Sequence, residues 1–350
     1  MSTEVDKVLG SKGKIDASAL KLGYVIDVPR DLYISILSLD ATTLTSRPRP
    51  GANSIARLAS DYINMAPLPP GHNPPLVTDV DITFPTPQIL LATINRPKKL
   101  NAIDYPLAHQ LSRLWDWYDA HPSLRCAILT GTGTKAFCAG SDLLAIERGQ
   151  KLKEEGKVGQ EELWKYDMPE SGFGGMSRRK GKKPILAAVN GLALGGGMEM
   201  VLNSDISVAS PTASFGLPEA TVGVYAYGGG LPRLVRTVGL HAASDIALTG
   251  RRVSAQEAFD LRIVSRIAKT LESVLDETLE VAKQIANISP DGIVVTRAAL
   301  REAWETASVE RAFQLVHERY YEDLMKSQNS REGLAAFREK RKATWREAKL

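Results

Sequence analysis

The sequence predicts an α/β protein in which short buried strands alternate with helices. Apolar runs at residues 89–94, 126–130 and 185–189 carry this prediction. Runs that are apolar throughout are typical of strands covered on both faces, because a strand with one solvated face would alternate apolar and polar side chains. Stretches of helical periodicity separate the runs, and this alternation favours helices layered on a sheet.

The elements follow one another in a regular order. A helix expected at 106–119 lies between the first two apolar runs and makes a strand–helix–strand unit with them. A further apolar run at 205–209 ends at Ser210-Pro211, a typical turn sequence. After about Gly228 the chain is predicted to be mostly helical, and one helix there has a single apolar face, made by Leu275, Leu279, Ala282 and Ala286.

Three parts are expected along the chain: an N-terminal extension over 1–78, a core over 79–270 and a C-terminal helical region over 271–350. The extension contains SRPRPG and APLPPGHNPP, and proline disfavours both helix interiors and central strands. The spacing of apolar residues within 52–65 is compatible with one short helix there.

Composition and charge narrow the functional class. Among 350 residues, 44 Lys and Arg against 40 Asp and Glu give a formal net charge of +4, which does not predict a nucleic-acid partner. Two cysteines predict neither a disulfide framework nor a metal site, and indicate a reducing compartment. No membrane span or secretory signal is recognised, so no membrane partner is expected. The basic segment SRRKGKK at 177–183 is interpreted as solvated surface.

Several common catalytic classes lack their motifs. None of the five histidines stands beside a candidate nucleophile, a glycine turn or a second histidine at metal-ligand spacing. The Gly-x-Ser-x-Gly, Gly-x-x-x-x-Gly-Lys-Ser/Thr and His-Glu-x-x-His patterns are absent. The candidate chemistry therefore rests on three glycine-bearing turns, each directly after an apolar strand, two of which carry a glutamate.

The first turn is KAFCAGSDL at 135–143. Its small residues Ala139, Gly140 and Ser141 would let a ligand approach the backbone, and Asp142 is placed to cap a following helix. A plain strand-to-helix turn with a capping aspartate is the simpler explanation of this segment taken alone.

The second and third turns each carry a carboxylate. In NGLALGGGMEM at 190–200, three successive glycines cost about 1 kcal/mol each in a helix relative to alanine, so a close backbone approach or an unusual turn is expected. Glu199 follows among apolar residues, where desolvation raises a carboxyl pKa and suits it to proton transfer. A phosphate loop or a tight helix-packing site is the alternative. In SFGLPEATVGVYAYGGG at 214–230, Glu219 comes 20 residues after Glu199, so the two carboxylates can converge on one cleft.

The combined motifs resemble those of the crotonase superfamily, the enoyl-CoA hydratase/isomerase family, over about residues 80–345. The matching segments are NRPKKLNAI at 95–103, AFCAGSDL at 136–143, KKPILAAVNGLALGGGMEMVLNSD at 182–205, SFGLPEATVGV at 214–224, LTGRRVSAQEAFDLRIVSRI at 248–267 and FREKR at 337–341. The resemblance implies a crotonase-like ββα spiral core with a C-terminal helical trimerisation region. It also implies a homotrimer or homohexamer that binds an acyl-CoA thioester, with no cofactor beyond the coenzyme A of the substrate.

The resemblance also assigns roles to residues. The family's oxyanion hole falls on the backbone amides of Ala139 and Gly196, and its two acid–base carboxylates fall on Glu199 and Glu219. Preorganised amides suit this task, because each is worth about 3–4 kcal/mol to a developing oxyanion. The predicted substrate-contacting residues are Lys98, Lys99, Leu100, Ala139, Gly140, Ser141, Asp142, Gly196 and Tyr227.

The implied function is an enoyl-CoA hydratase, which adds water across the 2,3-double bond of an acyl-CoA or removes it in reverse. Two carboxylates favour hydration, because moving a double bond needs only one proton shuttle. A double-bond isomerase, or a secondary-metabolism hydratase or dehydratase for a branched hydroxyacyl-CoA, is the alternative. A non-catalytic acyl-CoA-binding protein is the alternative from a different class.

One departure from the family pattern concerns the acyl pocket. Family hydratases often carry Pro-Gly-Ala-Gly-Gly after the second glutamate, but residues 226–230 read AYGGG, so Tyr227 stands at the expected glycine. Two interpretations remain open. Tyr227 and the nearby Tyr225 either make a polar acyl pocket suited to a hydroxylated or branched chain, or both pack outward.

The last three residues suggest a cellular address. Ala348-Lys349-Leu350 is a variant of the Ser-Lys-Leu peroxisomal signal. The sequence therefore predicts recognition by the peroxisomal import receptor and a peroxisomal location.

Overall fold

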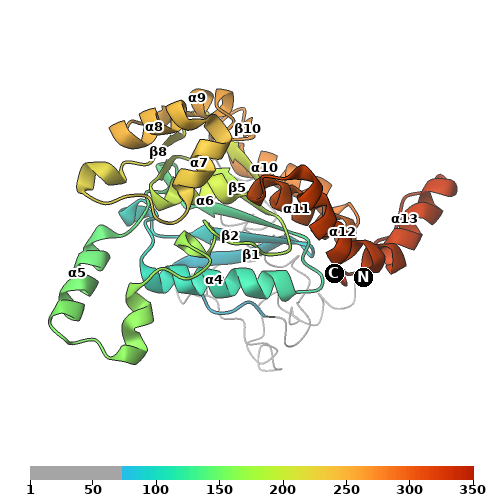
Figure 1. Ribbon diagram of the computed structural model, residues 1–350, viewed down its shortest axis with the longest axis horizontal. Helices are drawn as coiled ribbons and strands as arrows, with labels where there is room; N and C mark the ends of the chain where they lie inside the picture. Colours follow the sequence, from blue (N-terminus) through green and yellow to red (C-terminus); the bar gives the residue numbers. More distant parts are fainter. Residues whose placement is uncertain (1–72) are drawn as a thin grey trace, which may run out of the picture. The chain divides into compact units, whose positions relative to one another are not determined.

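The computed structural model describes residues 73–350, where two β-sheets are covered by helices (Figure 1). The larger sheet has the strand order β1-β2-β3-β5-β7-β10 and the smaller one the order β4-β6-β8-β9. The strands are Val80–Thr86 (β1), Ile89–Ile94 (β2), Cys126–Gly131 (β3), Ala136–Cys138 (β4), Ile185–Val189 (β5), Leu192–Leu194 (β6), Ile206–Ala209 (β7), Ser214–Gly216 (β8), Val253–Ser254 (β9) and Arg266–Ile267 (β10).

The helices follow the strands closely along the chain. The α-helices are Tyr105–Ala120 (α4), Leu143–Glu154 (α5), Gly196–Asn203 (α6), Gly230–Val238 (α7), Leu240–Thr249 (α8), Ala255–Asp260 (α9), Val274–Ala286 (α10), Pro290–Glu305 (α11), Val309–Lys326 (α12) and Gln328–Arg338 (α13). Short 3-10 helices are Pro97–Lys99 (η3), Gln160–Tyr166 (η4), Phe173–Gly175 (η5) and Glu219–Val222 (η6). The predicted α/β class and the mostly helical C-terminal region are confirmed.

Successive strands alternate between the two sheets, and this alternation positions the site. β3, β5 and β7 lie in the larger sheet, while the strands that follow each of them, β4, β6 and β8, lie in the smaller one. Within each sheet these strands run parallel. Because the carboxyl ends of parallel strands meet at one edge, the segments that follow β4, β6 and β8 are brought side by side.

The larger sheet is buried on both faces, which explains why its strands are apolar throughout. In β3, Ala127 and Leu129 belong to the hydrophobic core that contains Trp115 of α4. The alternate residues of β3 belong to the opposite core, with Val281 and Ala282 of α10. This period of two is the pleat of a β-strand. The amphipathic face predicted between Leu275 and Ala286 is confirmed as the face of α10 that packs on the sheet.

The C-terminal helices are anchored by a partly buried ion-pair cluster. Asp205, just before β7, accepts hydrogen bonds from Arg297 Nε at 2.9 Å and from Arg301 at 2.8 Å, both on α11. α12 and α13 pack on α11 (Figure 1). They carry large apolar side chains that are exposed in the single chain, namely Val309, Phe313, Tyr321, Met325, Leu334 and Phe337.

The basic segment at 177–183 is solvated only in part: Arg178, Lys180 and Lys182 are exposed, as the charge of the segment predicted, but its other side chains are not. Ser177, Arg179 and Lys183 are buried. Arg179 pairs with Asp119 at 2.5 Å, and the ammonium of Lys183 donates to the carbonyl oxygen of Tyr118 at 3.1 Å. The segment therefore holds the end of α4, a use of basic side chains that depends on contacts about 60 residues away.

One predicted segment lies outside the described residues, and two kinds of feature are absent from the described ones. The extension up to residue 72, with its compatible helix at 52–65, lies outside the described residues. No helix between residues 73 and 350 combines the length and apolar character needed to cross a bilayer. In the same part of the chain, no cluster of three or more His, Cys, Asp or Glu side chains is arranged to hold a metal ion.

Candidate active site

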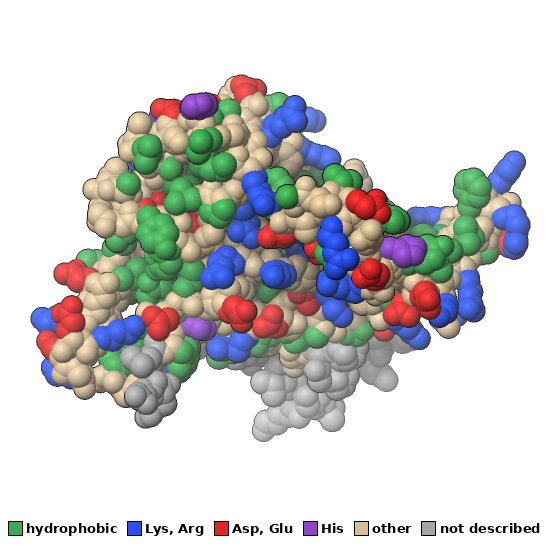
Figure 2. All heavy atoms as spheres, in the orientation of Figure 1, with side chains coloured by type: hydrophobic (Ala, Val, Ile, Leu, Met, Phe, Trp, Pro, Cys, Tyr) green, Lys and Arg blue, Asp and Glu red, His purple; other side chains and the backbone are tan. Residues whose placement is uncertain are grey.

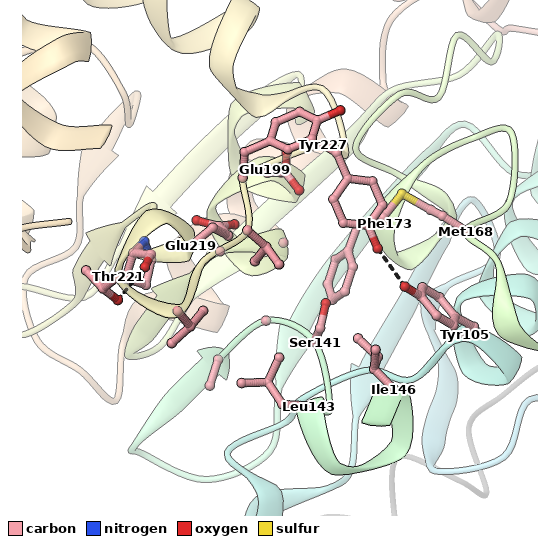
Figure 3. A pocket seen from close by; sticks show the side chains of 18 of the residues that line it. Tyr105, Ser141, Leu143, Ile146, Met168, Phe173, Glu199, Glu219, Thr221 and Tyr227 are labelled. Carbon is pink, nitrogen blue, oxygen red and sulfur yellow. Dashed lines mark hydrogen bonds between the residues drawn. The ribbon is translucent and has the colours of Figure 1, made fainter. Parts of the chain in front are cut away.

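A pocket of about 430 Å³ lies at the edge where β4, β6 and β8 end, and both predicted carboxylates line it (Figure 3). Its wall combines the turn after β4, the start of α6, η6 and the loop before α7 with parts of α4, α5 and the segment around η5. The lining residues are Tyr105, Ala139, Gly140, Ser141, Leu143, Ile146, Gln150, Met168, Phe173, Gly195, Gly196, Glu199, Pro218, Glu219, Thr221, Val222, Val224, Tyr225 and Tyr227.

Glu199 is a buried carboxyl surrounded by backbone. It lies in the first turn of α6, is only 2% exposed, and accepts a hydrogen bond from the amide of Gly230 at 2.9 Å. A Cβ at Gly228 would collide with its carboxyl group, and one at Gly230 would lie 2.6 Å from its Cγ. Burial raises its pKa to about 7, and the charge of Glu219 adds to the rise. Glu199 can therefore exchange a proton near neutral pH.

Glu219 supplies the second carboxyl of the pocket. It begins η6, three residues after the end of β8. Burial raises its pKa as well. Its Oε2 is buried and has no hydrogen-bond partner within residues 73–350. Because a buried carboxyl oxygen is costly to leave unpaired, a bound molecule or a water is the expected partner. The predicted convergence of Glu199 and Glu219 on one cleft is confirmed.

The structure corrects one of the two amides predicted to bind a substrate oxygen. The amide of Ala139 donates to the carbonyl oxygen of Leu100 at 3.0 Å, so it is not free. Two residues later, Ser141 forms a parallel bridge with Ile103. The two hydrogen bonds of this bridge are made by Ile103 with the residues on either side of Ser141. The amide of Ser141 itself therefore points away from Ile103 and is the available donor in this turn.

Gly196 supplies a second available amide. It is the first residue of α6, where backbone amides lack partners inside the helix and the helix dipole is positive. No hydrogen bond to the amide of Ser141 or Gly196 occurs within the described part of the chain. Gly140 has φ 94°, and a Cβ there would lie 2.8 Å from the oxygen of Leu194 and 3.5 Å from the nitrogen of Gly196. Only glycine lets this turn approach α6 so closely, and the approach brings the two amides to one pocket.

The other predicted substrate contacts divide into two groups. Ala139, Gly140, Ser141 and Gly196 line the pocket as expected, and so does Tyr227. Lys98, Lys99, Leu100 and Asp142 are not part of its lining.

Asp142 has a structural role instead. Its carboxylate accepts from Lys99 Nζ at 2.7 Å and caps α5 by accepting from the amide of Ala145 at 3.3 Å, which confirms the predicted cap. Burial alone would raise its pKa, but the hydrogen bonds from Lys99 and Ala145 lower it. The ammonium of Lys99 already has an anionic partner, whereas Lys98 is exposed. A role for Lys98, Lys99 and Leu100 near a coenzyme A stays a prediction.

Tyr227 lines the pocket and is 43% exposed, so it does not pack wholly outward. Its hydroxyl is 2.6 Å from that of Tyr105 in the first turn of α4 (Figure 3). Burial and this hydrogen bond raise its phenol pKa. Tyr225 is 65% exposed at the rim, with its ring centroid 6.0 Å from that of Tyr227. Of the two tyrosines, Tyr227 is therefore the less exposed, and its hydroxyl is held in the pocket wall by Tyr105.

Sequence reasoning missed three supporting residues of the site. Tyr105 carried no motif. Phe173 packs so tightly on Gly196 that a Cβ there would overlap its ring. Ser177 Oγ accepts from the amide of Phe173 at 2.8 Å and donates to the carbonyl oxygen of Gly228 at 2.6 Å, which holds the loop against Glu199. The glycine cluster GFGG at 172–175 was the one available signal for this segment.

Alternating parallel sheets, a pair of free amides and two carboxyls, one buried and one half-buried, define enzymes of the crotonase superfamily. The chain belongs to the enoyl-CoA hydratase/isomerase family, whose model matches residues 86–348. It is an enzyme of hydro-lyase type, with the crotonase fold that the sequence predicted.

Individual relatives are similar over most of the described chain. A mevalonyl-coenzyme A hydratase of Beauveria bassiana is 48% identical over 281 residues, which cover 79% of this chain and 98% of the relative. The mevalonyl-coenzyme A hydratase of Aspergillus fumigatus is 44% identical over 276 residues, with the same two coverages. A carnitinyl-CoA dehydratase of Proteus mirabilis is 36% identical over 265 residues, which cover 74% of this chain and 95% of the relative.

Solved structures show the same fold. The crystal structure of an enoyl-CoA hydratase from Mycobacterium tuberculosis superposes with a TM-score of 0.67 at 33% sequence identity. The match covers 76% of this chain and 98% of that one.

Proposed function

We propose that this protein interconverts a branched 3-hydroxyacyl-CoA and the corresponding 2,3-enoyl-CoA by removing or adding water, with mevalonyl-CoA as the hydroxyacyl substrate. The observation that carries the reaction is one pocket with two free amides and two carboxyls, the buried Glu199 and the half-buried Glu219. The branched substrate is supported by the names of the two fungal relatives, which match over 98% of their length. A hydratase for simple straight-chain substrates is less well supported, because the enoyl-CoA hydratase of known structure is 33% identical, against 48% and 44% for the two mevalonyl-coenzyme A hydratases.

The amides of Ser141 and Gly196 bind the thioester oxygen in this proposal. When water adds to C3 or leaves it, negative charge develops on that oxygen as the thioester becomes enolate-like. Fixed N–H donors stabilise such charge without reorganisation, by about 3–4 kcal/mol each. Gly196 adds the positive end of the α6 dipole.

The two carboxyls move the protons. In the hydration direction, the carboxylate takes a proton from water as the hydroxyl oxygen bonds to C3, and the protonated carboxyl delivers its proton to C2. One proton is held by the pair before and after the step, so the balance closes. A pKa of about 7 at Glu199 suits this sharing, because both protonation states are populated near neutral pH.

The test is an assay with 5-hydroxy-3-methylpent-2-enoyl-CoA, the dehydrated form of mevalonyl-CoA, beside crotonyl-CoA. We expect loss of the conjugated enoyl-thioester absorbance, gain of one water by mass spectrometry, and a higher kcat/KM for the branched substrate. Glu219→Gln should lower kcat at least 100-fold, while Glu154→Gln on the exposed face of α5 should leave it unchanged.

Three outcomes would contradict all or part of the proposal. Loss of absorbance without a change in mass would identify a double-bond isomerase. Unchanged absorbance and mass, in a protein that binds both thioesters, would identify an acyl-CoA-binding protein without hydratase activity. A preference for crotonyl-CoA would leave the hydratase reaction in place and overturn the branched substrate.

We also propose that the enzyme assembles as a homotrimer or a pair of trimers. Apolar side chains exposed on α12 and α13 support this (Figure 2), Phe313 and Phe337 among them, because large apolar side chains that gather on a surface are costly to leave in water. Light scattering coupled to size exclusion should give three or six copies, and Phe313→Glu with Phe337→Glu should lower that number. A monomer at micromolar concentration would contradict it.

A peroxisomal location is the last part of the proposal. Ala348-Lys349-Leu350 matches the import signal. In the structure the amide of Lys349 donates to Asp291 at 2.8 Å, and its side chain is exposed. An N-terminally fluorescent fusion should concentrate in peroxisomes and become diffuse when Leu350 is deleted. Diffuse fluorescence of the intact fusion would contradict a peroxisomal location.

A further inference from the structure

A pair of hydrogen-bonded phenol hydroxyls forms part of the pocket wall. The Oη atoms of Tyr105 and Tyr227 are 2.6 Å apart, and both side chains line the pocket. The two residues are 122 positions apart in the sequence, so the fold brings them together. In Figure 3 these two oxygens meet on one side of Glu199, and Glu219 lies on the other.

The surroundings of the pair are largely apolar. The hydroxyl of Thr221 is already engaged, because it donates to the carbonyl oxygen of Pro218 at 2.6 Å. The apolar side chains of the wall are Leu143, Ile146, Met168, Phe173, Val222 and Val224. Apart from the two glutamates and the tyrosines, the polar side chains of the lining are Ser141, Gln150 and Thr221, so an acyl chain finds few hydroxyl or amide partners there besides the two phenols.

The hydrogen-bonding capacity of the pair selects its ligand. Two phenols carry two protons, of which one is used between them, so one donor and several acceptor lone pairs remain. A neutral hydroxyl group can accept from that donor and donate to a lone pair at once. A carboxylate cannot donate, and the two glutamates of the same pocket would repel it. An alkyl group would leave the one remaining phenol donor without a partner.

We propose that Tyr105 and Tyr227 bind a hydroxyl group on the acyl chain, remote from the C2–C3 bond, and so select polar-tailed acyl-CoAs over hydrocarbon ones. This selection rests on the proposed hydratase function, because it concerns the acyl side of the same pocket. It accounts for a tyrosine at a position where family hydratases often have glycine.

The test compares two substrates that differ by one hydroxyl, 5-hydroxy-3-methylpent-2-enoyl-CoA and 3-methylpent-2-enoyl-CoA. The unmodified enzyme should prefer the first by about 10- to 100-fold in kcat/KM. Tyr227→Phe should reduce this ratio, and Tyr105→Phe with Tyr227→Phe should bring it close to one by a loss on the hydroxylated substrate alone. Tyr166→Phe is the matched control, since it removes a phenol hydroxyl outside the pocket lining and should keep the ratio.

Failure of the selection and failure of the hydratase function give different results. An unchanged ratio in the double variant, or an equal loss on both substrates, would overturn the selection while hydration persists. If the unmodified enzyme hydrates neither substrate, the hydratase function fails. The pair is then judged by calorimetric binding of 5-hydroxy-3-methylpentanoyl-CoA and 3-methylpentanoyl-CoA. A ratio of dissociation constants that survives in the double variant would overturn the selection there too.

Discussion

Replacing Glu199 by glutamine should make the protein inactive and, at alkaline pH, more stable. The carboxyl is 2% exposed, and its pKa in the folded chain is about 7 against an ordinary 4.5. The folded state therefore binds the proton more tightly than the unfolded state. This contribution to stability is fully present below pH 4.5 and is lost as the pH rises through 7, because ionising the buried group is unfavourable. Glutamine keeps an acceptor for the amide of Gly230 but never ionises.

The size of the effect follows from the two pKa values. At about 1.36 kcal/mol per unit, the cost of the charged form approaches about 3 kcal/mol at pH 8 and is below about 1 kcal/mol at pH 5. The stability difference between Glu199→Gln and the unmodified protein should therefore grow by about 2.5 kcal/mol from pH 5 to pH 8. Comparing the two pH values removes pH-independent changes in packing at the substituted side chain.

Urea unfolding followed by circular dichroism measures this difference, at one protein concentration because any assembly would add to the apparent stability. Glu154→Gln on the surface of α5 serves as the control for losing a carboxylate. A gain for Glu199→Gln that is equal at pH 5 and pH 8 would refute the reasoning, since it would show that the carboxyl is not ionised against its preference. A stability difference that moves against Glu199→Gln between pH 5 and pH 8 would refute it more strongly.

Three further predictions test the frame of the site. Gly230→Ala should lower kcat at least 10-fold in a folded protein, because its Cβ would lie 2.6 Å from the Glu199 Cγ. Gly292→Ala is the control and should keep full activity, because no neighbour lies closer than 3.4 Å to its added Cβ. Equal activity of the two variants would contradict the crowding at Glu199. Asp205→Asn should cost about 3 kcal/mol in urea unfolding by leaving the arginines of α11 unpaired, and a loss below about 1 kcal/mol would contradict that anchor. Cys126 and Cys138 should resist Ellman's reagent at pH 8 until urea is added, because both thiols are buried and burial raises the pKa of Cys138 to about 12. Rapid reaction of the native protein would contradict this prediction, because it would show that a thiol is accessible.

The sequence predicted correctly those features that depend on residues close together along the chain. The apolar runs located β2, β3, β5 and β7, and a glutamate after a glycine turn located both carboxyls. It failed where a residue's role depends on pairing with a distant segment. Ala139 and Ser141 look alike in sequence, and only the pairing with Leu100 and Ile103 decides which amide is free. The partnership of Tyr105 with Tyr227 likewise exists only after α4 and the loop before α7 are placed in one fold.

Two kinds of backbone build this pocket, and they differ in how freely they can evolve. Ser141, Gly196 and Glu219 each follow a paired strand of the smaller sheet by no more than three residues, so strand pairing fixes where they lie. The wall from Val222 to Tyr227 runs mostly through an irregular loop outside both sheets. Side chains in such a loop can change without shifting the paired strands. Substitutions at a few loop positions can thus change which substrate is bound, while the residues that carry out the reaction stay in place.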